Sequence, residues 1–185
     1  PHFHETKQFQ VIVDGEGIFG KQRIAPISIQ YANAHTPYGP IISGEHGITY
    51  FTLRSRWDPG AKYMPASSDK LVKGRQRSKL VAGVPSDLPS IRLNRKAPTL
   101  DSIIAKESDG LAAWRLCLGP WQISTVVTPV NSGGQYMIVS EGAMLFRGSS
   151  LTRLSLLFLT AGEEALRVVA GEEGLDLVIL QFPNG

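Results

Sequence analysis

The first residues of the chain contain a pair of histidines, His2 and His4, separated by one residue. Successive side chains of a β-strand point to opposite faces, so a strand here directs both imidazoles to one face, and Gln8 has the same parity. Two imidazole nitrogens in this arrangement can bind one transition-metal ion and supply half of its ligands. Paired histidines near a chain end also occur as ordinary surface residues, so the pair alone leaves the choice open.

A metal site in this chain would have to use nitrogen and oxygen ligands. Cys117 is the single cysteine, which excludes an internal disulfide and a multi-thiolate site and favours a reducing, cytoplasmic location. Its half of the chain has no histidine, so we expect the thiol to be a core residue rather than a nucleophile. The four histidines are all in the first quarter of the chain: His2, His4, His35 and His46.

The chain contains an internal repeat. When the sequence is aligned with itself at an offset of 127 residues, 8–15 (QFQVIVDG) matches 135–142 (QYMIVSEG), and 44–48 (GEHGI) matches 171–175 (GEEGL). The 28 residues between the two matching stretches need no gap. The chain is therefore interpreted as two copies of one structural unit.

Each copy has the pattern of β structure, with short runs rich in Val, Ile, Phe and Tyr between glycine-containing turns. The pattern predicts strands at 9–13, 24–29, 48–53, 136–139, 154–159, 166–169 and 175–182. Only 99–106 has the spacing of a helix. The fold class is therefore predicted to be all-β, of the sandwich or barrel type. We expect these residues in or near the cores: Phe9, Val11, Val13, Ile138, Phe158, Val168 and Leu177.

A basic segment lies between the two copies. Positions 54–96 hold eleven Lys and Arg residues and three acidic ones, a net charge of +8 in a chain whose net charge is +3. The segment is rich in Pro, Ser and Gly, which predicts a first unit at 1–56, a solvated connection at 57–98 and a second unit at 99–185. Few aromatic residues accompany the charges, so we do not expect nucleic-acid binding. No apolar run reaches the roughly 18 residues of a membrane span, so no membrane insertion is expected.

The first copy resembles the two sequence motifs of the cupin superfamily. In the first motif, His2 and His4 match the two histidine ligands, Gln8 stands where cupins have a glutamate ligand, and Gly15 matches the closing glycine. The resemblance implies a bicupin, which consists of two tandem cupin-type β-barrels (jelly-roll-like double-stranded β-helices), here joined by the basic segment.

The second cupin motif is matched only in part. Gly20 and Pro26 match, and Ser28 replaces a glycine of the motif. Tyr31 replaces the histidine ligand, and His35 stands where the motif has asparagine. An aromatic residue at position 31 also has a packing role as an alternative, since its counterpart in the second copy is Phe158.

The resemblance implies a mononuclear metal enzyme in the first barrel. One divalent ion (Fe, Mn, Ni or Zn) would bind to His2, His4 and Gln8, with dioxygenase chemistry on a small organic molecule and Tyr31 or His35 as proton donor or acceptor. The neutral Gln8 leaves the ion without an anionic protein ligand, which lowers metal affinity. The alternative is a barrel that has lost catalysis and binds a small organic ligand or serves in assembly.

The second copy lacks the histidines, since Pro129, Asn131 and Gly162 stand at the positions of His2, His4 and His35. We therefore expect it to be structural. The stretch 38–40 (YGP) has no counterpart in the second copy, and this difference is expected to mark the mouth of the pocket.

Two further expectations concern the context of the barrels. The run 154–159 (LSLLFL) is apolar on both faces, which predicts a homodimer that covers one of them. Two predicted strands precede Gln135, whereas only seven residues precede Gln8, so the opening strands of the first barrel are expected upstream of Pro1.

Overall fold

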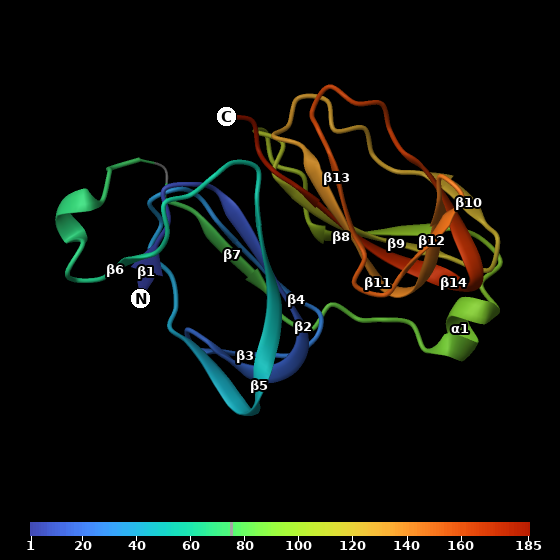
Figure 1. Ribbon diagram of the computed structural model, residues 1–185, viewed down its shortest axis with the longest axis horizontal. Coiled ribbons are helices and arrows are strands. Elements are labelled where there is room, and N and C mark those ends of the chain that lie inside the picture. The colour runs from blue at the N-terminus through green and yellow to red at the C-terminus, as the bar shows by residue number, and fades with distance from the viewer. Residues whose placement is uncertain (75) are drawn as a thin grey trace. The chain divides into compact units, whose positions relative to one another are not determined.

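The computed structural model describes residues 1–74 and 76–185, which form two compact units, Pro1–Val84 and Pro85–Gly185 (Figure 1). Among the described residues, the regular elements are strands except for the 3₁₀ turn η1 (Ser68–Lys70) and the short helix α1 (Pro89–Leu93). The predicted all-β fold class is confirmed. One of the basic residues counted in the sequence, Arg75, lies outside the described residues.

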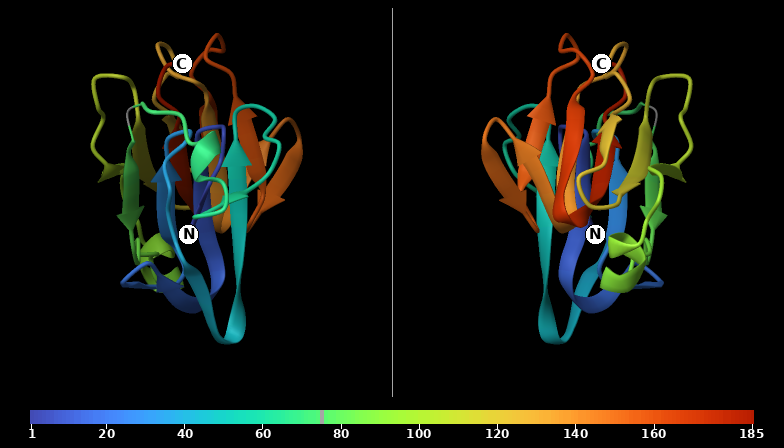
Figure 2. Two further views of the ribbon diagram at one scale, coloured as in Figure 1. Left: turned by 90° about the vertical axis from the view of Figure 1, so that its left-hand side faces the viewer. Right: turned by 90° about the vertical axis from the view of Figure 1, so that its right-hand side faces the viewer.

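The first unit is built around one long antiparallel pair, β2 (Gln8–Phe19) with β5 (Ile41–Arg54). The two strands bend together, and Figure 2 shows this bend in the middle of β5. The other strands extend this pair or lie beside it: β3 (Gln22–Ile24) on β2, β4 (Ser28–Ala32) on β2, β7 (Ser78–Val81) on β4, and β1 (His2–Phe3) paired with β6 (Lys62–Tyr63).

The second unit has the same central pair, formed by β11 (Gln135–Phe146) and β14 (Arg167–Gln181). Its sheet has the order β12-β11-β14-β9-β8, with β10 on β14 and β13 on β11. The bounds of these strands are β8 (Thr99–Ile104), β9 (Ala112–Leu118), β10 (Ile123–Thr125), β12 (Ser149–Thr152) and β13 (Leu156–Leu159).

The structure confirms the repeat in detail. β11 begins and ends 127 positions after β2, and the pairing irregularities also correspond. They fall at 12–14 and 15–17 on β2, and at 139–141 and 142–144 on β11. Gly15 and Gly142, with φ of 74° and 72°, occupy the same place in the two bends. Only glycine adopts this left-handed backbone at little cost, which explains why the turn glycine recurs.

The cores follow the alternation of the strands. Six of the predicted core residues are buried: Phe9, Val11, Val13, Ile138, Val168 and Leu177. The prediction for Phe158 is wrong, because this side chain is 38% exposed. It lies on the edge strand β13, where its ring packs against Tyr136 with the centroids 4.6 Å apart.

The helical spacing at 99–106 is misleading, because Thr99–Ile104 is strand β8. It pairs with β9 along five positions, from Thr99 opposite Cys117 to Ile104 opposite Ala113. Pairing with a buried neighbouring strand outweighs the weak local preference for a helix.

The basic segment at 57–98 is not a separate connection between the units. β6 and β7 belong to the first unit, and α1 to the second. In α1, Arg92 is buried, and its Nε donates a hydrogen bond to the carbonyl oxygen of Glu173 at 2.8 Å. The charge pattern suggested solvation, but the alkyl parts of long basic side chains also cover apolar surface. The structure places the division of the units at Val84 and Pro85.

Among the residues that the structure describes, no helix combines the length and the apolar character of a membrane span.

The bend glycines predict a position-specific loss of stability. A Cβ at Gly142 would lie 2.1 Å from the carbonyl oxygen of Gly174, whereas Gly148, with a similarly positive φ, has no atom within 4 Å. Gly148→Ala should therefore cost only the left-handed strain, about 1 kcal/mol, and Gly142→Ala about 3 kcal/mol or more. Urea unfolding of both variants measures the difference. Equal losses would show that the close approach at Gly142 is unimportant.

Candidate functional site

His2 is fixed to Tyr38 by its backbone and its side chain. The backbone N–H of each residue donates to the carbonyl oxygen of the other, at 3.1 and 3.0 Å. The His2 Nε2 atom lies 3.0 Å from the Tyr38 hydroxyl, and the two rings are in edge contact. Strand β1 and the segment before β5 therefore bring the first imidazole beside a buried phenol, and burial raises the pKa of Tyr38 to about 12.

His4 is buried and is held by Asp58. Its Nδ1 lies 2.7 Å from Asp58 Oδ1, and the same carboxylate accepts hydrogen bonds from the backbone of Glu5 and Gly60 and from the Thr6 hydroxyl. Burial of Asp58 opposes ionisation, but the hydrogen bonds from His4 and Gly60 and the nearby charge of Arg54 lower its pKa to about 2. An ionised carboxylate only accepts, so the proton of neutral His4 is on Nδ1.

Gln8 connects the two histidines through its amide group. Its side-chain NH₂ donates to the Tyr38 hydroxyl, and its oxygen accepts from Arg54 Nε at 3.1 Å. Arg54 Nη2 lies 3.1 Å from Nδ1 and 3.4 Å from Nε2 of His4. We call this set the histidine cluster, and its members are His2, His4, Gln8, Tyr38, Arg54 and Asp58.

The structure brings together three of the predicted site residues. The rings of His2 and His4 have their centroids 5.2 Å apart, and Gln8 reaches both through Tyr38 and Arg54. Their proximity thus agrees with the sequence analysis, although β1 ends at Phe3 and Gln8 lies on β2, so no single strand carries the three residues. Their role as metal ligands remains a prediction.

Tyr31 and His35 lie outside the histidine cluster. Tyr31 is opposite Phe9 in the β2–β4 pairing, so it is on the other face of the sheet from Gln8, and its hydroxyl donates to Asn33 Oδ1 at 2.6 Å. The ring of His35 packs against Phe3, and its backbone N–H donates to the carbonyl oxygen of His4 at 2.7 Å. Through this hydrogen bond, His35 holds the backbone of His4 in place.

Sequence reasoning missed three members of the cluster. The sequence does indicate a role for the region of Tyr38, because the stretch 38–40 does not match the second copy. Arg54 and Asp58 belong to the basic stretch 54–96, whose composition predicts a solvated segment. In the sheet, Arg54 pairs with Gln8 just as Gln181 pairs with Gln135.

The second unit shows which part of the cluster belongs to the scaffold. Gln135 Nε2 donates to Gln181 Oε1 at 2.7 Å, and both residues are buried. This contact joins the same register positions as the one between Gln8 and Arg54, but its direction is reversed, since Gln8 accepts and Gln135 donates. An amide held by its register partner is therefore common to both units, whereas the guanidinium and the imidazoles occur only in the first.

The donor set of the cluster does not fit a divalent ion in the observed arrangement. The Gln8 oxygen already accepts from Arg54, and the Arg54 guanidinium lies 3.4 Å from His4 Nε2, the ring nitrogen that could bind a metal. A fixed positive charge at this distance repels a cation. Burial lowers the pKa of His2, and its neighbours His4, the amino terminus and Arg54 lower it further.

A second group with metal-ligating atoms lies in the second unit. Asp87, Cys117 and Asp176 place their ligand atoms within 4.8 Å of one another, the one such group found among the described residues. Arg115 Nη2 occupies the gap, at 2.7 Å from Asp87 and 2.8 Å from Asp176. Arg95 also pairs with Asp87. Burial raises the pKa of Cys117 to about 12, so the thiol stays protonated, and the group is a buried ion-pair network.

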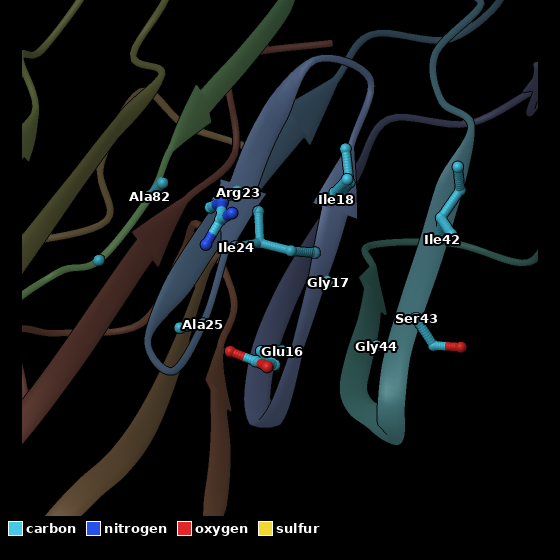
Figure 3. Close-up of a pocket in the computed structure, with 11 residues that line it drawn as sticks. Glu16, Gly17, Ile18, Arg23, Ile24, Ala25, Ile42, Ser43, Gly44 and Ala82 are labelled. Carbon is cyan, nitrogen blue, oxygen red and sulfur yellow. The ribbon is translucent and has the colours of Figure 1, made fainter.

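A groove of the first unit is lined by residues other than the histidines. It has a volume of about 510 Å³, and Ile18, Ile24 and Ile42 line it together with Glu16 and Arg23 (Figure 3). A groove of about 460 Å³ lies at the corresponding place in the second unit, with Leu145 at the position of Ile18. Because both units have it, the bend of the central strand pair accounts for this groove.

The Asp58 carboxylate predicts a pH-dependent contribution to stability. Its pKa is lower in the folded protein than the usual 3.8, so ionisation stabilises the fold above about pH 4, and this increment is lost as the pH falls towards 2. Asp58→Asn should therefore lower the free energy of unfolding by about 2 kcal/mol near neutral pH and by much less near pH 2.5. Urea unfolding at the two pH values measures this difference, with Asp69→Asn as an exposed control. A loss of the same size at both pH values would contradict the assignment.

No family model and no curated protein matches the sequence, but solved structures match the fold over nearly the whole chain. A protein from Nostoc punctiforme that is assigned as a dioxygenase aligns with a TM-score of 0.66 and 10% identity, covering 99% of this chain and 64% of its own. Quercetin 2,3-dioxygenase from Acinetobacter baumannii gives a TM-score of 0.53 and 15% identity, with 99% and 66% covered. The pirin YhhW from Escherichia coli, solved in complex with nickel(II), gives 0.51 and 10%, with 100% and 77% covered.

This chain thus spans 64% and 66% of the lengths of the two dioxygenase structures. Identities this low show a common fold and no more. Alignment over both units, together with the strand-by-strand repeat, fits the architecture expected from the sequence resemblance. The chain therefore has the bicupin fold, two tandem cupin-type β-barrels.

Proposed function

We propose that the first unit of this chain binds a small organic molecule at the histidine cluster. The observation that carries this proposal is the contrast between the two units. They share the central strand pair and its bend, yet the residues 127 positions after the ionisable and phenolic members of the cluster are all neutral and non-phenolic. These pairs of positions are His2/Pro129, His4/Asn131, Tyr38/Ala165, Arg54/Gln181 and Asp58/Gly185.

The chemistry of the cluster suits such a ligand. His2 is only partly buried, so the cluster can be reached from solvent on that side. Its ring contacts those of Tyr38 and Tyr63, with centroids 4.6 and 5.6 Å away. Aromatic surfaces beside a few fixed hydrogen-bonding groups are typical of small-molecule sites.

A metal-dependent enzyme of the dioxygenase type is the second candidate, with one Fe, Mn, Ni or Zn ion at His2, His4 and Gln8. Two observations favour it. Dioxygenases and a nickel-bound pirin have the same fold, and Asp58 supports His4 Nδ1 in the way that carboxylates support metal-binding histidines. This candidate requires that the Arg54 guanidinium move away from His4 and Gln8.

One set of samples tests both candidates. Protein prepared without a histidine tag is screened by thermal shift against small organic acids, phenols and amides, and its metal content is measured after dialysis. We expect ligands whose binding is lost in His4→Asn, which installs the residue of the second unit, and kept in the control Asn131→Ala. We expect less than about 0.1 metal ion per chain. A full equivalent of metal that His2→Ala and His4→Ala each remove would instead establish the second candidate.

We also propose that a second copy of the chain covers the exposed face of β13. Leu156 and Phe158 are 39% and 38% exposed on this edge strand. The groove beside them is also lined by Arg147 and Arg167 and by Glu163 and Glu164. A patch with an apolar centre and both signs of charge can pair with its own copy about a twofold axis.

Sedimentation tests the proposed dimer. We expect the wild-type chain to sediment at about twice its 20.1 kDa mass at micromolar concentration. Phe158→Glu should give a monomer, because two carboxylates would be buried at the twofold interface. Ile42→Glu, on an exposed apolar residue of the first unit, is the control and should remain dimeric. A monomeric wild type would overturn the proposal.

A further inference from the structure

We infer that Arg54 is the resident cation of the first barrel and that the ligand bound there carries a carboxylate group. This inference rests on the proposed function and deepens it by naming the class of ligand. It depends on the direction of the hydrogen bonds in the histidine cluster, which decides whether lone pairs or N–H groups are available to a ligand.

Arg54 sets the direction of the first hydrogen bond. A guanidinium only donates, so the Gln8 atom that faces Arg54 Nε must be the amide oxygen. The NH₂ group of Gln8 is then the atom that faces Tyr38, and the Tyr38 oxygen accepts from it. The hydroxyl proton of Tyr38 is left to donate to His2 Nε2.

Two of the lone pairs that a metal ion would need are therefore used within the protein. His2 Nε2 accepts from Tyr38, and Gln8 Oε1 accepts from Arg54. His4 carries its proton on Nδ1, and Arg54 Nη2 lies beside its ring, 3.1 Å from Nδ1 and 3.4 Å from Nε2, where its positive charge opposes a metal ion. Since Nε2 is the accepting atom of His2, the neutral ring has its proton on Nδ1 and can offer a donor to a ligand.

The Asp58 carboxylate is directed at His4 and the neighbouring backbone, so the partners that the cluster has for an anionic acceptor are the Arg54 guanidinium and the N–H of His2. A guanidinium binds a planar carboxylate through parallel N–H groups and distinguishes it from a neutral amide of the same shape. The second unit shows that the fold does not need this charge, because Gln181 makes the corresponding contact with Gln135.

Arg54→Gln is therefore the matched variant, since it installs the residue that the second unit has at the same register position. Benzoate and benzamide are suitable probes, because they differ in charge and hardly in shape. In titration calorimetry, the wild type should bind benzoate with a dissociation constant at least tenfold lower than that for benzamide. Arg54→Gln should weaken benzoate binding at least tenfold and leave benzamide unchanged, while Gln181→Ala, the control in the second unit, should keep the preference of the wild type.

A gain-of-function variant tests the other half of the inference. Gln8→Glu combined with Arg54→Gln removes the cation and adds an anionic ligand beside His2 and His4, so it should bind about one Ni²⁺ per chain by calorimetry. Wild-type protein should bind Ni²⁺ at least tenfold more weakly. Circular dichroism of the variants checks that the fold is kept.

The outcomes separate this inference from the proposed function. Two results would overturn the inference and leave small-molecule binding in place. One is a set of ligands whose binding requires His4 but none of which is a carboxylate. The other is equal binding of benzoate by the wild type and Arg54→Gln. Tight stoichiometric Ni²⁺ binding by the wild type would also overturn it. A wild type that binds no probe and no member of the ligand panel would remove both proposals.

Discussion

The long bent pairing of two strands, β2 with β5 and β11 with β14, is the constraint on which the rest of each unit depends. The paired irregularities let both strands curve together around a core, and glycines with positive φ make the curvature possible. The same pairing sets the register that places Gln8 opposite Arg54 and Gln135 opposite Gln181. A slip by one residue would turn every side chain of the strand to the other face, so the geometry of the site follows from the geometry of the fold.

The two units show how one scaffold can be charged or neutral at the same place. In the second unit an amide holds an amide, and Gln181 also donates to the carbonyl oxygen of Gly110 at 2.6 Å. In the first unit the partner is a guanidinium, which reaches beyond the amide to an imidazole. Because the backbone arrangement is common to both, the difference between the units lies in the side chains and not in the barrel.

The limits of the sequence analysis have physical causes. The repeat predicted the central strands, because each bend needs a glycine and the same glycine therefore recurs 127 positions later in the sequence. Tyr31 was placed near the ligands by matching a motif without gaps, but its strand turns the ring toward Phe9 and away from Gln8. Arg54 and Asp58 could not be found by the same reasoning, since a charged residue in a basic stretch has no local sign of the buried partner that it meets in the fold. The Asp58 carboxylate reaches His4 across 54 positions of sequence.

If Arg54 is the resident cation, as proposed above, the direction of hydrogen bonding explains how a bicupin fold can have two histidines near its amino terminus that hold no metal ion. Replacing a glutamate ligand by glutamine changes more than the charge, because an amide donates as well as accepts. Once the oxygen of Gln8 accepts from Arg54, its NH₂ group must find an acceptor, and the Tyr38 hydroxyl supplies one. The hydroxyl keeps its own proton, which we infer it donates to His2 Nε2, 3.0 Å away. A single arginine therefore sets the polarity of three consecutive groups, so a site that has the residue types of a metal centre presents donors to its ligand.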